Sequence, residues 1–200
     1  ICYLTEQYRQ KNNALNDILN EIRSGMISQQ TINLLESRIE YFPDEIDSQT
    51  RLYTHNMDVD RINKGQLNNI DSSTKVFEAK VAGNPVLVEV LKKSVLAEEV
   101  LELKIGAKVM FVRNNFEVGF VNGTLGNVSG YTEKNEPIIK TLDGEFYIAK
   151  PEAWAIEDES GKALASFTQV PLRLAWAITI HKSQGMTLDS AFIDLSKAFE

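Results

Sequence analysis

Near the C-terminal end of the chain, an apolar run is interrupted by five polar or small residues and then resumes. The first run spans residues 174–180, the interruption is His181-Lys182-Ser183-Gln184-Gly185, and the second run spans residues 191–195. This pattern predicts a strand, a sharp polar turn that opens a short helix, and another strand. In an open α/β sheet such a turn is a site for phosphate or nucleic acid, because the first backbone N–H groups of the helix have no partner within it.

The composition limits the class of protein. The 200 residues suffice for one large domain or two small ones, and 43% apolar with 24% charged residues is ordinary for a globular chain. No apolar run approaches the ~20 residues needed to cross a bilayer, and the single Cys2 cannot form an internal disulfide. We expect a cytoplasmic protein with no membrane partner. The missing initiator Met and the end directly after a predicted strand indicate a piece of a longer polypeptide.

The net charge of −7 is unevenly distributed. Residues 36–60 carry −5 and residues 151–160 carry −4, so the remainder carries +2. Because salt screens charges over ~10 Å, a modest nucleic-acid groove can lie on an acidic protein. The overall charge argues against a free-standing, tight, non-specific DNA binder.

The N-terminal part predicts helices and one strand. A first amphipathic helix has Asn12 or Asn13 as its cap and Gly25 as its stop, and Ser28 can cap a second helix. The apolar positions at helical spacing in the first helix are Leu15, Ile18, Leu19 and Ile22. Residues 51–55 are typical of a short strand, and Asn56 can cap the helix that follows.

The middle of the chain changes to short strands. Residues 75–81 alternate like a strand, and residues 86–103 are ambiguous between helix and strand. Asn122-Gly123 and Asp143-Gly144 are typical hairpin turns, and residues 157–161 form a predicted acidic linker. Five further strands are predicted at residues 108–113, 124–131, 137–142, 145–149 and 153–157. So many strands in a short span indicate a small barrel.

The order is therefore α/β, small β, and α/β again. The fold class expected is an α/β domain with a parallel sheet, split by an inserted small β-barrel. We expect residues 1–70 and 168–200 to form the split α/β domain and residues 71–167 to form the inserted β-rich module, with its barrel at about 104–157.

Four segments in this order resemble the second RecA-like domain, a P-loop NTPase-type fold, of superfamily 1B DNA helicases of the RecD and Pif type. These segments are Leu4–Gln10, Arg51–Asn63, Gly106–Gly126 and Pro171–Asp189. The third resembles the family's inserted barrel of the Src-homology-three type, and the fourth its DNA-coupling motif. The resemblance implies a motor domain of an ATP-dependent 5′→3′ DNA helicase.

The resemblance also implies a role for Arg9. In the family, the matching arginine is a finger that reaches the γ-phosphate of ATP bound against the other RecA-like domain. A guanidinium suits this role because it is always charged and grips phosphate bidentately while charge develops on the transferred group. Taken alone, an arginine before a helix is more often solvated. Gln10 is a weaker nucleotide-binding candidate, and it can equally pack or cap.

For the polar turn, the resemblance implies that Thr179 and His181 contact the DNA backbone, with Lys182 and Ser183 beside them. Hydroxyl, imidazole and backbone N–H groups position a strand without reading its bases. Lys182 either adds a charge contact or faces solvent, and Thr179 can instead be a helix N-cap. Gln184 is the candidate sensor of the γ-phosphate or its water, and Gly185 lets the backbone approach the nucleotide closely.

The catalytic machinery in this chain is incomplete. No G-x-x-x-x-G-K-[ST] sequence occurs, and the acidic motif that holds Mg²⁺ is missing as well. ATP and Mg²⁺ are therefore implied only for the full-length protein, with single-stranded DNA and an N-terminal RecA-like domain of the same polypeptide as partners. We expect a monomer, no metal site in this chain, and no catalysis by the chain alone.

Two alternatives remain open. The chain can be a module that holds single-stranded DNA or a partner without hydrolysis, or the helicase part of a relaxase or exonuclease subunit. Trp154 and Trp176 suit base stacking, but core packing is the better interpretation of both because they lie in predicted strands.

Overall fold

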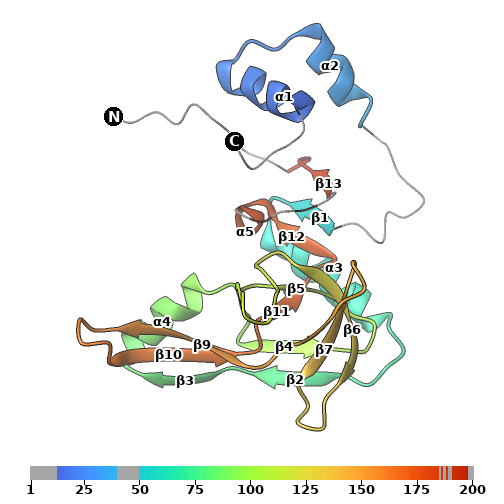
Figure 1. The fold of residues 1–200 in the computed structure, drawn as a ribbon. Helices are drawn as coiled ribbons and strands as arrows, with labels where there is room; N and C mark the ends of the chain where they lie inside the picture. The colour runs from blue at the N-terminus through green and yellow to red at the C-terminus, as the bar shows by residue number, and fades with distance from the viewer. Residues whose placement is uncertain (1–12, 40–49, 185, 187, 189–190, 198–200) are drawn as a thin grey trace. The chain divides into compact units, whose positions relative to one another are not determined.

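The computed structural model describes residues 13–39, 50–184, 186, 188 and 191–197 (Figure 1). The chain divides into two compact units, residues 1–46 and residues 47–200, and each is described by itself.

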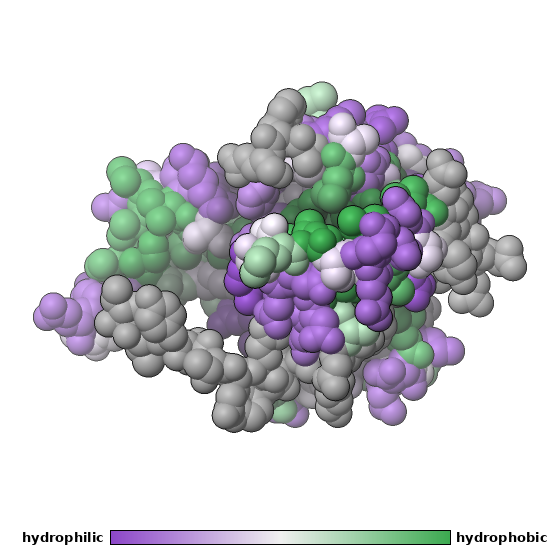
Figure 2. All heavy atoms as spheres, turned by 90° about the horizontal axis from the view of Figure 1, so that it is seen from above, coloured by the Kyte–Doolittle hydropathy of each residue, from purple (hydrophilic) through white to green (hydrophobic). Residues whose placement is uncertain are grey.

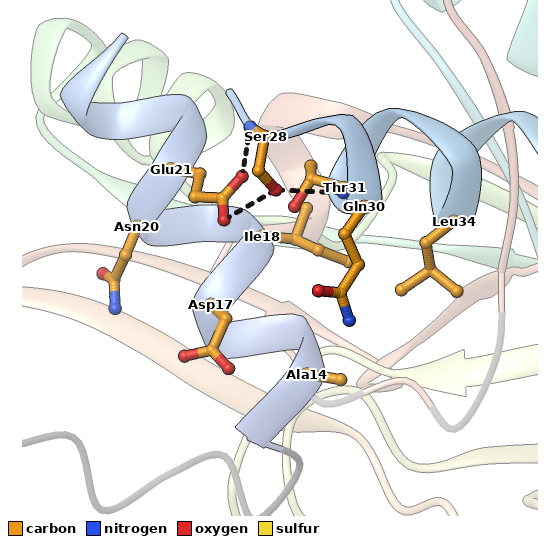
Figure 3. Close-up of a pocket in the computed structure, with 9 residues that line it drawn as sticks. All are labelled: Ala14, Asp17, Ile18, Asn20, Glu21, Ser28, Gln30, Thr31 and Leu34. Atoms are coloured by element: carbon orange, nitrogen blue, oxygen red, sulfur yellow. Dashed lines mark hydrogen bonds between the residues drawn. The ribbon is translucent and has the colours of Figure 1, made fainter. Parts of the chain in front are cut away.

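The described part of the first unit contains two helices, α1 (Asn13–Ser24) and α2 (Gln29–Glu36), and both lie where the sequence predicts helices. Gly25, at φ +72°, ends α1, because a left-handed residue closes a helix and glycine adopts it without strain. Ser28 is the N-cap of α2, and its Oγ accepts from the Thr31 N–H at 3.2 Å. The Ser28 N–H and O–H donate to the Glu21 carboxylate at 2.8 and 3.0 Å (Figure 3). These hydrogen bonds lower the pKa of Glu21.

Hydrophobic side chains lie at the surface among hydrophilic ones on the face of the molecule that Figure 2 shows. On α1 the apolar residues at helical spacing are only partly covered: Ile18 is buried, whereas Leu15 and Ile22 remain exposed. The predicted helix is therefore confirmed, but its apolar stripe is not enclosed by the described residues.

The second unit begins with a parallel three-stranded sheet in the order β12-β1-β13. Its strands are β1 (Thr50–Tyr53), β12 (Ala177–Thr179) and β13 (Ala191–Asp194). Helix α3 (Asn56–Asn68) follows β1, and the short α5 (Ile180–Ser183) follows β12. The strand–turn–helix–strand pattern predicted from the C-terminal run is confirmed. The expected cap at Asn56 is wrong by one residue: the N-cap is His55, and Asn56 is the first helical residue.

A five-stranded antiparallel sheet in the order β11-β5-β6-β7-β8 forms the centre of the β-rich part. Its strands are β5 (Lys108–Phe111), β6 (Leu125–Tyr131), β7 (Pro137–Thr141), β8 (Phe146–Ile148) and β11 (Leu172–Leu174). Gly144, at φ +86°, turns β7 into β8, as the Asp143-Gly144 pair predicts. The expected strand at residues 153–157 pairs outside this sheet.

That strand, β9 (Glu152–Glu157), belongs to a second antiparallel sheet with β3 (Lys80–Gly83) and β10 (Ala163–Gln169), in the order β3-β10-β9. The predicted acidic linker at residues 157–161 is wrong, because Asp158 N–H donates to the Lys162 carbonyl at 3.0 Å and closes a hairpin turn. An aspartate carboxylate can accept hydrogen bonds from backbone N–H groups of the same turn, so an acidic segment can form a tight turn as well as a linker.

The expected single strand at residues 75–81 divides into β2 (Lys75–Glu78) and β3, which pair in different sheets. β2 pairs with β4 (Val100–Leu103). The ambiguous run 86–103 resolves into helix α4 (Pro85–Ser94), capped by the Asn84 side chain, followed by β4.

The apolar run 174–180 serves two sheets. Leu174 lies in β11 and pairs with Val109, whereas Ala177 to Thr179 form β12 beside β1. Ala175 and Trp176 join the two strands: Ala175 N–H donates to the Lys108 carbonyl at 3.0 Å, and its own carbonyl accepts from the buried Thr50 hydroxyl at 3.1 Å. This segment therefore connects the β-rich part to the parallel sheet, and the two hydrogen bonds of Ala175 hold it in place.

The buried strand β5 connects two hydrophobic clusters. Val109 and Phe111 pack in one, with Phe120 and Leu172. Met110, between them in sequence, packs in the other. Because successive side chains of a strand point to opposite faces, β5 is buried on both.

Candidate nucleic-acid interface

Thr179 stands where β12 ends and α5 begins. The three residues of β12 are buried, and Thr179 has extended backbone angles with a side chain only 4% exposed. Its Oγ1 accepts from the Lys182 N–H at 3.4 Å, which makes it the N-cap of α5. The N-cap role that the sequence allows for Thr179 is thus observed, and its hydroxyl faces the backbone of α5.

The side chains of the polar turn divide into outward and inward groups. His181 and Gln184 are exposed, whereas Lys182 and Ser183 are half-buried. The Ser183 hydroxyl donates to the Ile180 carbonyl at 2.8 Å, so it is occupied within the helix. The surface available to a ligand at this turn is therefore formed chiefly by His181 and Gln184.

The register of the sheet brings a second chain segment to this turn. Tyr53 of β1 and Thr179 of β12 are direct partners in a parallel pair, so both strands end at the same level. After Tyr53 the chain continues through Thr54 and the N-cap His55 into α3, whose first residue Asn56 is exposed. Two helix starts, each with backbone N–H groups lacking helical partners, therefore follow neighbouring strand ends.

From the sequence, Asn56 is only a candidate helix cap, so the sequence does not predict this adjacency. The adjacency follows from the alignment of Tyr53 in β1 with Thr179 in β12, which are 126 residues apart in the chain. Local periodicity carries no information about such a distant pairing. Arg9, Gln10 and Gly185 lie outside the described residues.

A cluster of charged side chains lies behind the turn. Arg173 is 2% exposed, and its Nη2 is 3.7 Å from Glu98 Oε1. Its Nε and Nη1 are buried without a hydrogen-bond partner in the protein. Burial raises the pKa of Glu98, against the opposing attraction of Arg173. Burial, and secondly the charge of Arg173, lower the pKa of Lys182, which Glu98 and Asp60 partly oppose. Lys182 is therefore electrostatically coupled to Arg173, Glu98 and Asp60.

The two tryptophans lie in the hydrophobic clusters, as expected. Trp176 is half-buried and packs on the cluster of Val109 and Phe111. Trp154 meets Phe167 edge-on at 6.1 Å between ring centroids, and the Arg113 guanidinium carbon is 5.1 Å from its ring centroid. Neither ring stands free for base stacking.

Two features are absent from the described part of the chain. No group of three or more His, Cys, Asp or Glu side chains able to hold a metal ion occurs there. Among the same residues, no helix is long and apolar enough to cross a membrane.

Comparisons with known proteins point to one family. Residues 87–131 match the model of the 2B domain of the DNA helicase Pif1. The ATP-dependent DNA helicase Pif1 of Psychrobacter sp. (strain PRwf-1) is 40% identical over 258 aligned residues, covering 100% of this chain and 39% of that protein. The crystal structure of Bacteroides sp. Pif1 in complex with ADP-AlF4 has a TM-score of 0.80 at 28% identity, covering 96% of this chain and 45% of that one. Bacteroides Pif1 bound to single-stranded DNA has a TM-score of 0.62 at 28% identity, covering 98% and 46%.

These likenesses, with the parallel sheet and the antiparallel strands inserted between β1 and β12, define the class of the chain as a RecA-like helicase domain. Within that class the chain belongs to the Pif1 family of superfamily 1B helicases. It spans about two fifths of the length of the Psychrobacter relative. The resemblance stated from four sequence segments is confirmed.

Proposed function

We propose that this chain supplies the second motor domain of an ATP-dependent 5′→3′ DNA helicase. The relatives that it matches are named as ATP-dependent DNA helicases, and Bacteroides structures of the family hold ADP-AlF4 or single-stranded DNA. The full protein would bind ATP and Mg²⁺ against an N-terminal RecA-like domain and act as a monomer in the cytoplasm. Residues 1–70 and 168–200 would form the motor domain, with residues 71–167 as its inserted module.

The observation that carries this proposal is the register of Tyr53 with Thr179. It brings the starts of α3 and α5 together at the carboxyl ends of β1 and β12, where backbone N–H groups of the first helical turns can hold successive phosphates of a strand. Such contacts are neutral and carry no base preference. A strand held in this way can move along the protein, as translocation requires.

The residues of the polar turn take different parts in this proposal. His181, exposed at the start of α5, is the foremost DNA contact. Thr179 and Ser183 contribute by shaping the helix start, since their hydroxyls already bond the helix backbone. Lys182, half-buried in α5, contributes positive charge at the turn.

Arg9 and Gln184 would act on the nucleotide. Arg9 is the proposed finger on the γ-phosphate, where a bidentate guanidinium stabilises the charge of the transferred group. Gln184, with Gln10 and Gly185 near the nucleotide, would sense the γ-phosphate or its water. Gln184 is exposed and follows α5 directly. A movement of Gln184 would therefore also displace the turn that faces the DNA. Mg²⁺ would be held by the N-terminal domain, and no step here depends on residues of this chain binding it.

The test of the finger is Arg9→Ala in the full-length protein. We expect DNA-stimulated ATPase activity to be abolished while the affinity for single-stranded DNA is retained. The matched control is Arg23→Ala, which removes an exposed arginine from α1. Unchanged ATP turnover in Arg9→Ala would remove the finger assignment. A wild-type protein that binds DNA without hydrolysing ATP would support the binding-module alternative.

The test of coupling is Gln184→Ala in the full-length protein, with Gln30→Ala on α2 as its control. We expect Gln184→Ala to keep part of the ATPase activity and to lose base pairs unwound per ATP consumed. If the ratio of unwinding to ATP consumption stays normal, Gln184 has no coupling role.

A further inference from the structure

Among the described strands, the strand that leads into the polar turn lies at the edge of its sheet. β12 pairs there with β1 alone, in the order β12-β1-β13. On that side the Arg51 N–H donates to the Trp176 carbonyl at 2.9 Å. In a parallel strand neighbouring residues point their backbone groups to opposite sides. The N–H and C=O of Ala177 therefore face away from β1, where the described part of the sheet offers no strand.

A side chain of α3 fills this place. The Asn63 Nδ2 donates to the Ala177 carbonyl at 2.9 Å, and the Ala177 N–H donates to Asn63 Oδ1 at 2.9 Å. Asn63 is 5% exposed and Ala177 is fully buried. The carboxamide thus pairs with Ala177 as the backbone of another strand would, and it satisfies two buried groups that would otherwise be unpaired.

We propose that Asn63 is a positioning residue for the DNA-coupling turn: its carboxamide fixes where β12 ends, and with it the place of Thr179 and the start of α5. This inference rests on the proposed function. Ala177 is two residues before the N-cap Thr179, so a shift of β12 along α3 displaces the turn by the same amount. Asn63 makes no contact with DNA in this proposal.

The same contact fixes the distance between the two helix starts at the candidate interface. α3 follows β1 after Thr54 and the N-cap His55, and α5 begins directly after β12. Sheet pairing aligns β1 with β12, and Asn63 fastens α3 to β12 from the other side. A DNA strand whose phosphates bind both helix starts requires a constant separation between these two starts. The pairing of β1 with β12 is the first constraint on that separation, and the Asn63 carboxamide is the second.

The chemistry of the contact limits which side chains can replace Asn63. One atom must donate and one must accept, at the reach of a single methylene group. Asn63→Ala leaves both groups of Ala177 unpaired, and Asn63→Asp at neutral pH keeps the acceptor but sets a carboxylate against the Ala177 carbonyl. A protonated carboxyl could again donate and accept, so the Asn63→Asp variant should recover part of the wild-type behaviour as the pH is lowered.

The experiment uses the full-length protein with three variants: Asn63→Ala, Asn63→Asp and the control Asn68→Ala, which makes the same change at an exposed position of α3. The measurements are the affinity for a fluorescent single-stranded oligonucleotide, the DNA concentration that half-saturates the ATPase, and its rate at saturating DNA. The affinity for a fluorescent ADP, measured well below the melting temperature of each variant, reports whether nucleotide binding is intact. Hydrogen exchange of the Ala177 amide reports the contact itself.

We expect Asn63→Ala to raise the dissociation constant and the half-saturating concentration for DNA about tenfold, as loss of paired buried groups implies. The affinity of Asn63→Ala for ADP should be unchanged, and Asn68→Ala should resemble wild type in every measurement. A general loss of stability would instead weaken the binding of DNA and of ADP together. If Asn63→Ala equals Asn68→Ala in DNA affinity, the inference is wrong.

Two further outcomes remain decisive. Should Asn63→Ala fail to fold, Asn63→Asp replaces it, and DNA affinity at the wild-type level at neutral pH would overturn the inference. A wild-type protein without DNA-stimulated ATPase would overturn the proposed function instead. DNA affinity alone would then decide, and Asn63→Ala must still weaken it.

Discussion

Tyr53 and Thr179 are register partners across β1 and β12, and each is the last residue of its strand. The turns that follow therefore begin side by side, one opening α3 and the other opening α5. Only a parallel pair gives this arrangement, because in an antiparallel pair the two strand ends lie at opposite edges. The candidate interface is thus a property of sheet topology as much as of the polar turn itself.

The N-cap of α5 can be tested by changing the hydroxyl of Thr179 with little change of shape. Thr179→Val removes the acceptor of the Lys182 N–H, and we expect weaker capping by about 1 kcal/mol. In the full-length protein this corresponds to about a fivefold rise in the dissociation constant for single-stranded DNA, measured by fluorescence anisotropy. Thr179→Ser keeps the hydroxyl and should bind as wild type. Equal binding by the valine variant would show that the cap does not govern the interface.

Much of the local structure could be predicted from the sequence because its causes are local. Ser28 and Gly25 mark the ends of helices through their own backbone and side-chain chemistry, and the structure has both where expected. The division of residues 174–180 between two sheets could not be predicted. Its residues are apolar throughout, and only the distant partners Val109 and Arg51 determine which sheet each half joins.

The site was predicted in the same uneven way. The polar residues 181–184 indicate a turn after a strand, and that turn is present. The Asn63 carboxamide, by contrast, meets a backbone 114 residues away. Asn63 looks like any polar residue of a helix until the fold places Ala177 beside it. Long-range pairing of this kind leaves no periodic trace in a single sequence.

Gly126 permits a close approach between β6 and β7. A Cβ atom there would lie 2.6 Å from the Lys140 carbonyl oxygen and 2.7 Å from Ile139 Cγ2. We expect Gly126→Ala to lower the free energy of unfolding by about 2–3 kcal/mol, because the backbone must move to admit the methyl group. Gly130→Ala in the same strand meets nothing within 4 Å and is the control. Urea unfolding measures both, and equal midpoints for the two variants would contradict the close approach.

Lys108 gives a pH dependence that can be separated from other groups. Burial, and secondly the charge of Arg51, lower the pKa of Lys108 to about 8. Between about pH 8 and the ordinary lysine pKa of 10.5 the unfolded chain binds more protons, so this group makes stability rise with pH. Lys108→Met should therefore stabilise the protein at pH 7 by about 1–2 kcal/mol, with the gain shrinking toward pH 10.5. Urea unfolding across this range tests the sign, with the exposed Lys134→Met as control.

Arg173 and Glu98 are expected to cost stability. Burial lowers the pKa of Arg173 and raises that of Glu98, so for each group desolvation outweighs their mutual attraction. Arg173→Met removes a buried guanidinium with two unpaired nitrogens, and we expect a gain of about 1 kcal/mol at pH 5. A carboxyl whose pKa is raised in the folded state contributes stability at low pH and loses it as the pH rises through that pKa. The gain should therefore be smaller at pH 8 than at pH 5, because ionisation of Glu98 within this range then lacks its counter-charge.

Adding Glu98→Gln to Arg173→Met should reduce the pH dependence of the gain, because the carboxyl whose pKa is raised by burial is removed. Asp60, Lys64 and Lys182 also act on Glu98, and they are unchanged in both variants. The difference between single and double variants at the two pH values therefore isolates Glu98. If Arg173→Met is instead destabilising at pH 5 by more than about 1 kcal/mol, the guanidinium is a net stabilising element and the desolvation argument fails.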